Sequence, residues 1–218
     1  MYRTGLQRVV DLQVNRDGEA LTRLLNDPHA PVRARAAFAL GSVQDQDAVP
    51  ALLRLLQDPA PQVRADAAFA LGQMPGPVPS RSLLDALASE REPSVRAELL
   101  TALGKQGDST SLALLPHLAA AVSDAAALAL AIGRYALRDV HAPEAVAWLL
   151  PHLHAPDPNV RRNAAYYFGR SGQTTPWSPW ADSVRAALDR LAPDDPAAMH
   201  LVAGLGRLSD PADTPRLV

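Results

Sequence analysis

The chain has 218 residues, of which 48% are hydrophobic, and a formal charge of −2 at pH 7. A chain of this size and composition can fill a folded core, so we do not expect disorder. The charge gives no net positive field to attract nucleic acid or an anionic membrane, so a nucleic-acid partner is not expected, although a local basic patch stays open. Cysteine is absent, which excludes disulfides, thiolate zinc sites and cysteine nucleophiles.

Aromatic residues make up only 5% of the chain, and alanine and leucine are abundant, a balance that favours closely packed helices. No apolar run approaches the roughly 18 residues of a membrane span. The first residues lead into no signal-peptide core. We therefore expect an all-α protein without a membrane span. The cytoplasm is favoured as its compartment, with export the alternative if a leader has been removed, and the oligomeric state is left open.

The first predicted helix pair meets at Asp27-Pro28, where a run of leucines at helical spacing ends. Proline lacks an N–H and disfavours helical geometry in the residue before it, so the first helix stops there and a second restarts at the next Ala-Pro. One stripe of that second helix is apolar. It consists of Val32, Ala36, Ala37 and Leu40. The small alanines let neighbouring helices approach closely.

The pattern of this second helix recurs along the chain. Its regular copies are residues 32–41, 63–72, 95–104 and 160–169, and the first three are spaced by 31 and 32 residues. The last copy places Tyr166 where Phe38 and Phe69 stand. The first halves recur as well, because residues 48–59 repeat the leucine run that ends in Asp-Pro. Each unit is therefore predicted to be a first helix, a turn and a second helix.

Two further copies are less regular. Residues 129–138 fit the frame with Tyr135 in the place of Phe38, but lack the Val-Arg pair and the closing glycine. A sixth copy at 197–206 follows an irregular insert, residues 174–183, which contains prolines and tryptophans. Neither helix of a pair can bury its apolar stripe alone, whereas stacked pairs bury it between them. The sequence thus predicts one solenoid domain over 1–218 with about six helix pairs.

The two ends of the chain read as partial repeats. Residues 5–10 fall where the tail of an earlier second helix would lie, and residues 209–218 read as the start of another first helix. Neither segment has the polar outer face that terminal repeats need for solubility. We therefore expect the chain to be part of a longer protein.

The shared pattern L-L-x-L-L-x-D-P-x-x-x-V-R-x-x-A-A-x-A-L-G resembles the HEAT repeat, particularly the short bacterial kind of the phycobilin lyases, over nearly the whole chain. The resemblance implies an all-α, right-handed α-solenoid in a bacterial protein, whose concave face, formed by the second helices, binds a protein or peptide. Such repeats support many unrelated activities. The alternative is an accessory unit of an enzyme, either bilin-lyase-like or attached to a prolyl isomerase domain that lies outside this chain.

Charged residues recur at the turns between the two helices of a pair. A carboxylate lies six residues before an arginine in three units, where it can accept hydrogen bonds from the guanidinium and cap the second helix. The HEAT resemblance implies a ladder of such pairs between units. The predicted structural ladder consists of Asp27, Arg33, Asp58, Arg64, Glu90, Arg96 and Arg161.

A second set of residues shares a face of the second helices that is distinct from the apolar stripe. The groove candidates on this face are Arg35, Phe38, Asp66, Phe69, Tyr135, Asn163, Tyr166 and Tyr167. Aromatics flanked by mixed charges suit a peptide or protein segment. The alternative is that the rings fill space between successive units. Trp177 and Trp180 of the insert also have two interpretations. They either project from the surface and dock a partner, or they fill the space between poorly matched repeats.

We find no pattern that predicts catalysis or a cofactor. His152 and His154 are spaced so that their rings point apart on a helix, and no third ligand accompanies them, so no metal site is predicted. The iron-binding His-Glu pairs of HEAT-like deoxyhypusine hydroxylases do not occur. HEAT-like DNA glycosylases bind the phosphate backbone with a basic surface, which the charge of −2 and the single lysine disfavour.

Overall fold

The computed structural model describes residues 2–118, 122–172 and 176–217, and all regular structure in these ranges is helical. The chain divides into two compact units, Met1–Gly107 and Asp108–Val218, each considered by itself below. None of the helices in the described ranges combines the length and the apolar character that crossing a membrane requires.

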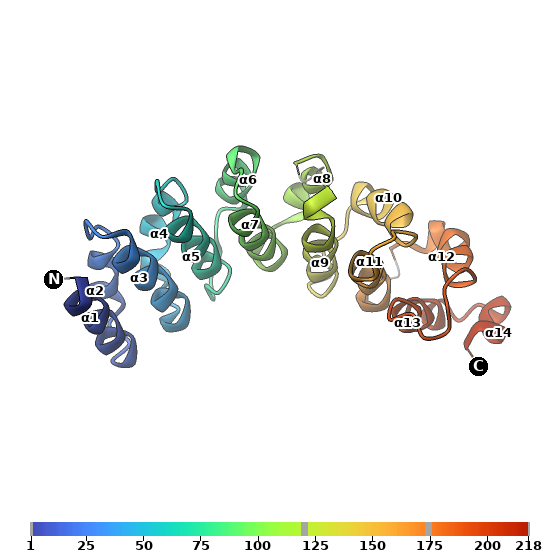
Figure 1. Ribbon diagram of the computed structural model, residues 1–218. Coiled ribbons are helices and arrows are strands. Elements are labelled where there is room, and N and C mark those ends of the chain that lie inside the picture. Colours follow the sequence, from blue (N-terminus) through green and yellow to red (C-terminus); the bar gives the residue numbers. More distant parts are fainter. Residues whose placement is uncertain (1, 119–121, 173–175, 218) are drawn as a thin grey trace. The chain divides into compact units, whose positions relative to one another are not determined.

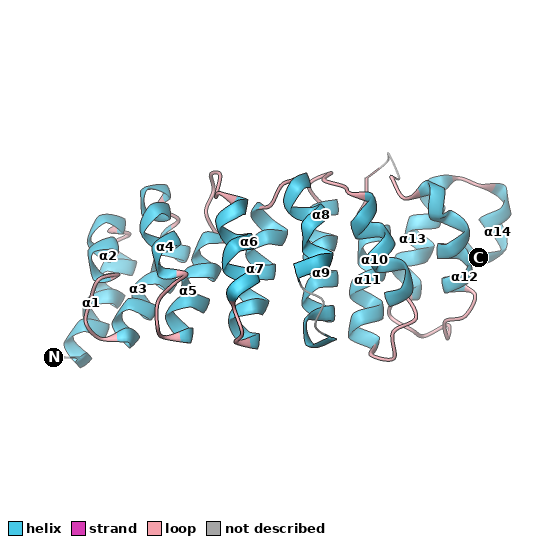
Figure 2. Cartoon of the chain, turned by 90° about the horizontal axis from the view of Figure 1, so that it is seen from above, coloured by secondary structure: helices cyan, strands magenta, loops and turns pink. Residues whose placement is uncertain are grey.

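Unit 1 consists of helix pairs that stack one after another (Figures 1 and 2). It opens with α1 (Tyr2–Val14), which packs against α3 as another second helix would. The pairs are α2 (Gly18–Leu24) with α3 (Ala30–Val43), α4 (Val49–Leu55) with α5 (Pro61–Leu71), and α6 (Ser80–Ser89) with α7 (Pro93–Gln106). A short 3-10 helix, η1 (Gln46–Ala48), leads into α4. The second helices α3, α5 and α7 contact one another in sequence, and each first helix packs on its own partner.

Unit 2 repeats the arrangement. Its pairs are α8 (Ser109–Leu118) with α9 (Ala125–Ala136), α10 (Pro143–His152) with α11 (Pro158–Arg170), and α12 (Ala181–Leu188) with α13 (Ala198–Leu208). The 3-10 helices η2 (Val122–Asp124) and η3 (Ser178–Trp180) precede α9 and α12, and η4 (Pro211–Asp213) leads into α14 (Thr214–Leu217). The predicted all-α solenoid of helix pairs is thus confirmed. The expectation of a single domain over residues 1–218 stays a prediction.

Small residues set the distance between neighbouring second helices. Val32, Ala36 and Leu40 of the predicted apolar stripe are all fully buried. A Cβ added to Gly41 would lie 3.0 Å from the Cα of Ala70 in α5, closer than ordinary contacts allow. The glycine therefore lets the backbones of α3 and α5 approach.

The structure corrects the register predicted for the fourth repeat. Gly41 faces the ring of Phe69 in the next second helix, and Gly133 faces the ring of Tyr166 in the same way. When the first and fourth repeats are aligned on these glycines, η2 and α9 together correspond to α3. The second helix of the fourth repeat therefore begins with a 3-10 turn. The closing glycine is therefore present, and Tyr135 does not take the place of Phe38. The missing Val-Arg pair had hidden this register.

The irregular insert is partly outside the described residues, because Thr174 and Thr175 fall in the gap. In the described part, Trp177 is fully buried, packs edge to face with Phe168, and donates its indole N–H to Ser171 Oγ at 2.6 Å. Trp177 is thus a filler between helices. Trp180 is half-buried.

Candidate functional site

The turn arginines join successive helix pairs. Arg33, on α3, donates from Nε and Nη2 to both carboxylate oxygens of Asp58, at 2.8 and 2.9 Å, although Asp58 belongs to the next pair. Its third nitrogen, Nη1, donates to the carbonyl of Asp27 in its own turn at 2.9 Å. Asp58 also accepts from the N–H of Ala60, which fixes the next turn. One arginine therefore holds two turns together.

The same geometry recurs at Arg64 and at Arg161. Arg64 donates from Nε and Nη2 to Glu90 at 2.6 and 3.0 Å, and from Nη1 to the carbonyl of Asp58 at 2.9 Å. The hydrogen bond from Arg64 outweighs burial and lowers the pKa of Glu90 to about 2. Arg161 donates to Asp195, at 3.0 and 2.6 Å, and to the carbonyl of Ala155 at 2.8 Å.

These contacts correct the predicted pairing within each turn. We expected Arg33, Arg64 and Arg96 to bond the carboxylate six residues before them. At Arg33 and Arg64 the guanidinium instead reaches the carbonyl of that residue, and the carboxylate comes from the following unit. The side chain of Asp27 instead accepts from His29. Arg96 likewise donates to the carbonyls of Leu87 and Glu90. The prediction missed Asp195. Its role can be recognised from the sequence only by looking for an acidic residue one repeat after Arg161.

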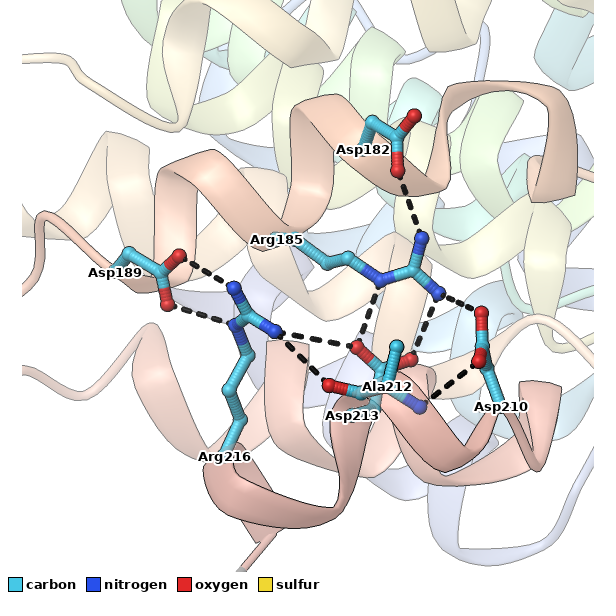
Figure 3. Close-up of polar contacts among 7 residues, drawn as sticks. All are labelled: Asp182, Arg185, Asp189, Asp210, Ala212, Asp213 and Arg216. Atoms are coloured by element: carbon cyan, nitrogen blue, oxygen red, sulfur yellow. Dashed lines mark hydrogen bonds and ion pairs between the residues drawn. The ribbon is translucent and has the colours of Figure 1, made fainter.

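A second ion-pair network, also missed, links α12 to η4 and α14 (Figure 3). Asp213 is fully buried at the end of η4, where η1 has Ala48. Arg185 donates to both of its carboxylate oxygens, at 2.7 and 2.9 Å, and also bonds Asp210 and Asp182. Arg216 bonds Asp189 with two nitrogens, both at 2.7 Å.

The hydrogen bond from Arg185 lowers the pKa of Asp213, so this buried carboxylate stays ionised and paired. Each of the six charged side chains in the network is paired with another member of it. The network therefore joins elements of unit 2.

In unit 1 four of the groove candidates lie half-buried on the second helices α3 and α5. The rings of Phe38 and Phe69 stack with centroids 4.9 Å apart and an interplanar angle of 9°, and both are half-buried. The guanidinium of Arg35 lies 5.1 Å from the centroid of Phe38 and donates to Gln13 at 3.0 Å. Burial raises the pKa of Asp66, whose carboxylate accepts from Gln62. Half-buried rings between charged side chains leave apolar area for a partner to cover.

In unit 2 the corresponding ring is that of Tyr166, which is half-buried on α11. It meets the ring of His200 from α13 edge to face, with centroids 5.4 Å apart. Arg170 lies 5.4 Å from the centroid of the Tyr166 ring. Burial lowers the pKa of His200, and the charges of Arg170 and Arg162 lower it further.

Three groove candidates do not belong to an accessible surface. Tyr135 and Tyr167 are fully buried, and Asn163 is 9% exposed. The Tyr135 hydroxyl bonds Ser111 Oγ at 2.9 Å and the Tyr167 hydroxyl bonds His141 Nδ1 at 3.0 Å, so both rings point toward first-helix residues and turns. Asn163 donates to the carbonyl of Ala126 on α9 at 2.9 Å. These residues pack the interior, because a buried side chain cannot contact a partner.

His152, one of the two histidines weighed as metal ligands, is held by contacts within the protein. His152 stacks on Trp148 with centroids 3.7 Å apart, and its Nδ1 donates to the Trp148 carbonyl at 2.7 Å. Across the described ranges, no three histidine or acidic side chains gather in a group that could hold a metal ion.

Residues 18–104 match the family described as HEAT repeats. No curated protein matches the chain. Among solved structures, the chain is similar to an engineered protein of the Northeast Structural Genomics Consortium, with a TM-score of 0.64 and 19% identity over 88% of this chain and 96% of that one. It is also similar to a designed armadillo repeat protein, with a TM-score of 0.59 and 16% identity over 87% of this chain and 98% of that one.

Identities this low show a shared fold and carry no activity from one protein to the other. Repeats of this kind are generally protein-interaction scaffolds. The match of residues 18–104, the structural likenesses and the stacked helix pairs together support a HEAT/armadillo-like repeat protein.

Proposed function

We propose that the chain is a protein-interaction scaffold that binds a segment of its partner on the faces of its second helices. The observation that carries this proposal is the stacked pair of Phe38 and Phe69, with Arg35 and Asp66 beside it. These rings are half-buried, whereas the leucines of the apolar stripe, such as Leu40 and Leu71, are fully buried. Aromatic and arginine side chains of this kind supply most of the affinity at protein interfaces.

The test begins with a partner, captured from a lysate of the source organism on the immobilised chain, identified and then purified. Titration calorimetry of that partner with Phe69→Ala and Tyr166→Ala should show losses of more than about 1 kcal/mol in binding free energy. Far-ultraviolet circular dichroism should stay unchanged. The matched control is Leu114→Ala, because Leu114 is 40% exposed but lies on the first helix α8.

Two results would contradict the proposal. Folded Phe69→Ala and Tyr166→Ala could bind as tightly as the wild type, or Leu114→Ala could weaken binding as much as they do. If the two aromatic substitutions instead unfold the chain while the folded fraction keeps its affinity, the rings are interior packing and the surface lies elsewhere.

A further inference from the structure

The second helices of unit 2 differ from those of unit 1 in charge. Helices α9, α11 and α13 contain no aspartate or glutamate; the buried Asp124 lies in the 3-10 turn η2 that opens the fourth second helix, and the other acidic residues of unit 2 lie on first helices, on η4 or in turns. The cationic residues of these three helices are Arg134, Arg161, Arg162, Arg170 and Arg207, with His200 beside them. In unit 1, by contrast, Asp66 lies on α5 and Glu98 on α7. Charge is therefore segregated within unit 2.

Two of these arginines form a stripe along α11 with the tyrosine that lies between them. Arg162, Tyr166 and Arg170 are four residues apart, so they lie on one face of the helix. Both arginines are exposed, and the ring between them is flanked by Gly133 of α9 and by His200 of α13. The charges of both arginines reach His200, since both act on its titration.

The two arginines are available to a ligand. Within the described ranges neither Arg162 nor Arg170 has a carboxylate partner, in contrast to Arg161, which Asp195 holds. Arg170 rests against the Tyr166 ring, and its side chain is exposed. An exposed guanidinium without a carboxylate is well suited to bond one from a partner, with two parallel hydrogen bonds.

We propose that the Arg162–Tyr166–Arg170 stripe, with His200, binds an acidic peptide segment of the partner. This inference rests on the proposed function and names the chemistry of the bound segment. The two arginines are separated by eight residues of helix, or about 12 Å along the axis. Two side chains four residues apart on an extended peptide span about 13 Å. Carboxylates at that spacing can meet both arginines while the residue between them covers Tyr166.

A peptide fits this stripe better than a nucleic acid does. Proteins that bind nucleic acid neutralise several phosphates in a row, and they need a net positive field over the binding surface. This chain has a net charge of −2, and unit 2 carries acidic residues on its first helices and in its turns. The stripe offers two arginines, which suit a short acidic segment better than a long run of phosphates.

In the experiment, peptides that bind the full chain are selected from a random library of displayed 12-residue peptides. The selection is repeated with the double variant Arg162→Gln, Arg170→Gln. Glutamine keeps the helix and removes the charge. We expect wild-type selection to enrich aspartate and glutamate, and the double variant to lose that enrichment. A selected peptide, made synthetically and labelled, should bind the double variant about ten-fold more weakly than the wild type by fluorescence anisotropy.

Three controls make the result decisive. Arg190→Gln removes an exposed arginine of unit 2 that lies outside the second helices, and it should leave peptide affinity within about two-fold. Replacing the acidic residues of the peptide by their amides should abolish binding. An oligonucleotide of ten thymidines should compete at least ten-fold less well than the peptide.

The outcomes separate this inference from the proposed function. Enriched peptides without acidic residues, with affinity unchanged in the double variant but lowered by Phe69→Ala, would overturn the inference and leave the scaffold standing. Stronger binding of the oligonucleotide than of any peptide would overturn it in favour of nucleic acid. Enrichment that is insensitive to substitutions on any second helix would overturn both.

Discussion

Arg33 and Asp58 lie in successive helix pairs, yet two guanidinium nitrogens bond two carboxylate oxygens between them at 2.8 and 2.9 Å. Burial acts to raise the pKa of Asp58, but the hydrogen bonds from Arg33 and from the Ala60 N–H together lower it. The carboxylate is thus held ionised at a turn that is largely shielded from water, where a charged hydrogen bond is worth more than on an open surface. The same arginine–carboxylate pairing recurs at Arg64 and Arg161. It couples the stability of one helix pair to that of the next helix pair.

The first prediction concerns this coupling. Arg64→Ala should lower the free energy of unfolding by about 2 to 3 kcal/mol, because it leaves the largely buried Glu90 carboxylate without its cation. Urea unfolding followed by circular dichroism measures the change. Arg81→Ala is the matched control: Arg81 is 80% exposed and pairs with Asp85 on the surface of α6, so its loss should change stability by less than about 0.5 kcal/mol. Equal losses in the two variants would mean that the turn pair adds nothing.

The second prediction concerns acid. Glu90 has a pKa of about 2 in the folded protein and 4.5 as its ordinary value, so its ionised form is favoured by folding. The stability that it contributes is present above pH 4.5 and is lost as the pH falls toward 2. Glu90→Gln should therefore lower the urea midpoint at pH 6 and should make the fall between pH 4.5 and 3 shallower than in the wild type. Parallel pH profiles for the two proteins would contradict the assignment.

The third prediction concerns the core. Leu71, at the end of α5, is fully buried, as its place in the repeat predicts. Leu71→Ala should cost roughly 2 to 5 kcal/mol, because the lost methyl groups leave a cavity. Val14→Ala, at a side chain that is 76% exposed, should cost less than about 0.5 kcal/mol. A loss below 0.5 kcal/mol at Leu71, by chemical unfolding, would mean that the core can collapse around the gap.

The fourth prediction concerns the corrected register. An alanine Cβ at Gly133 would lie 2.5 Å from Cδ1 of Tyr166, so the ring must move. Gly133→Ala should destabilise the protein by about 1 to 3 kcal/mol. In the Tyr166→Ala background the same change should be neutral or stabilising, because alanine is the better helix former once the ring is gone. Additive effects in this double-mutant cycle would place the two residues apart.

The repeat pattern could predict the fold because it is local. Proline after Asp27 and Asp58 ends the first helices, and the alanine stripes of the second helices require a neighbour, so helix pairs and their stacking follow from the sequence. The register of the fourth repeat could not be predicted in the same way, since the Val-Arg pair is replaced there and Gly133 is recognisable only by the ring it faces.

The site was harder to predict, because its contacts are long-range. The carboxylate six residues before Arg33 and the one in the next unit are equally plausible partners by spacing, and only the packing of the turns selects Asp58. Tyr166 and Tyr167 are adjacent, so the pattern placed both on the surface, but one helical step of 100° turns Tyr167 into the interior. Asp213 was missed because alanine occupies its position in η1.

The central claim is that a partner covers the second helices. Hydroxyl-radical footprinting of the full chain, with and without a purified partner, tests it most directly, with oxidation followed residue by residue. Phe69 and Tyr166 should lose most of their labelling when the partner binds, while Trp148, half-buried on the first helix α10, should keep its own. Protection of Trp148 and its neighbours on the first helices, with Phe69 and Tyr166 labelled as before, would contradict the claim.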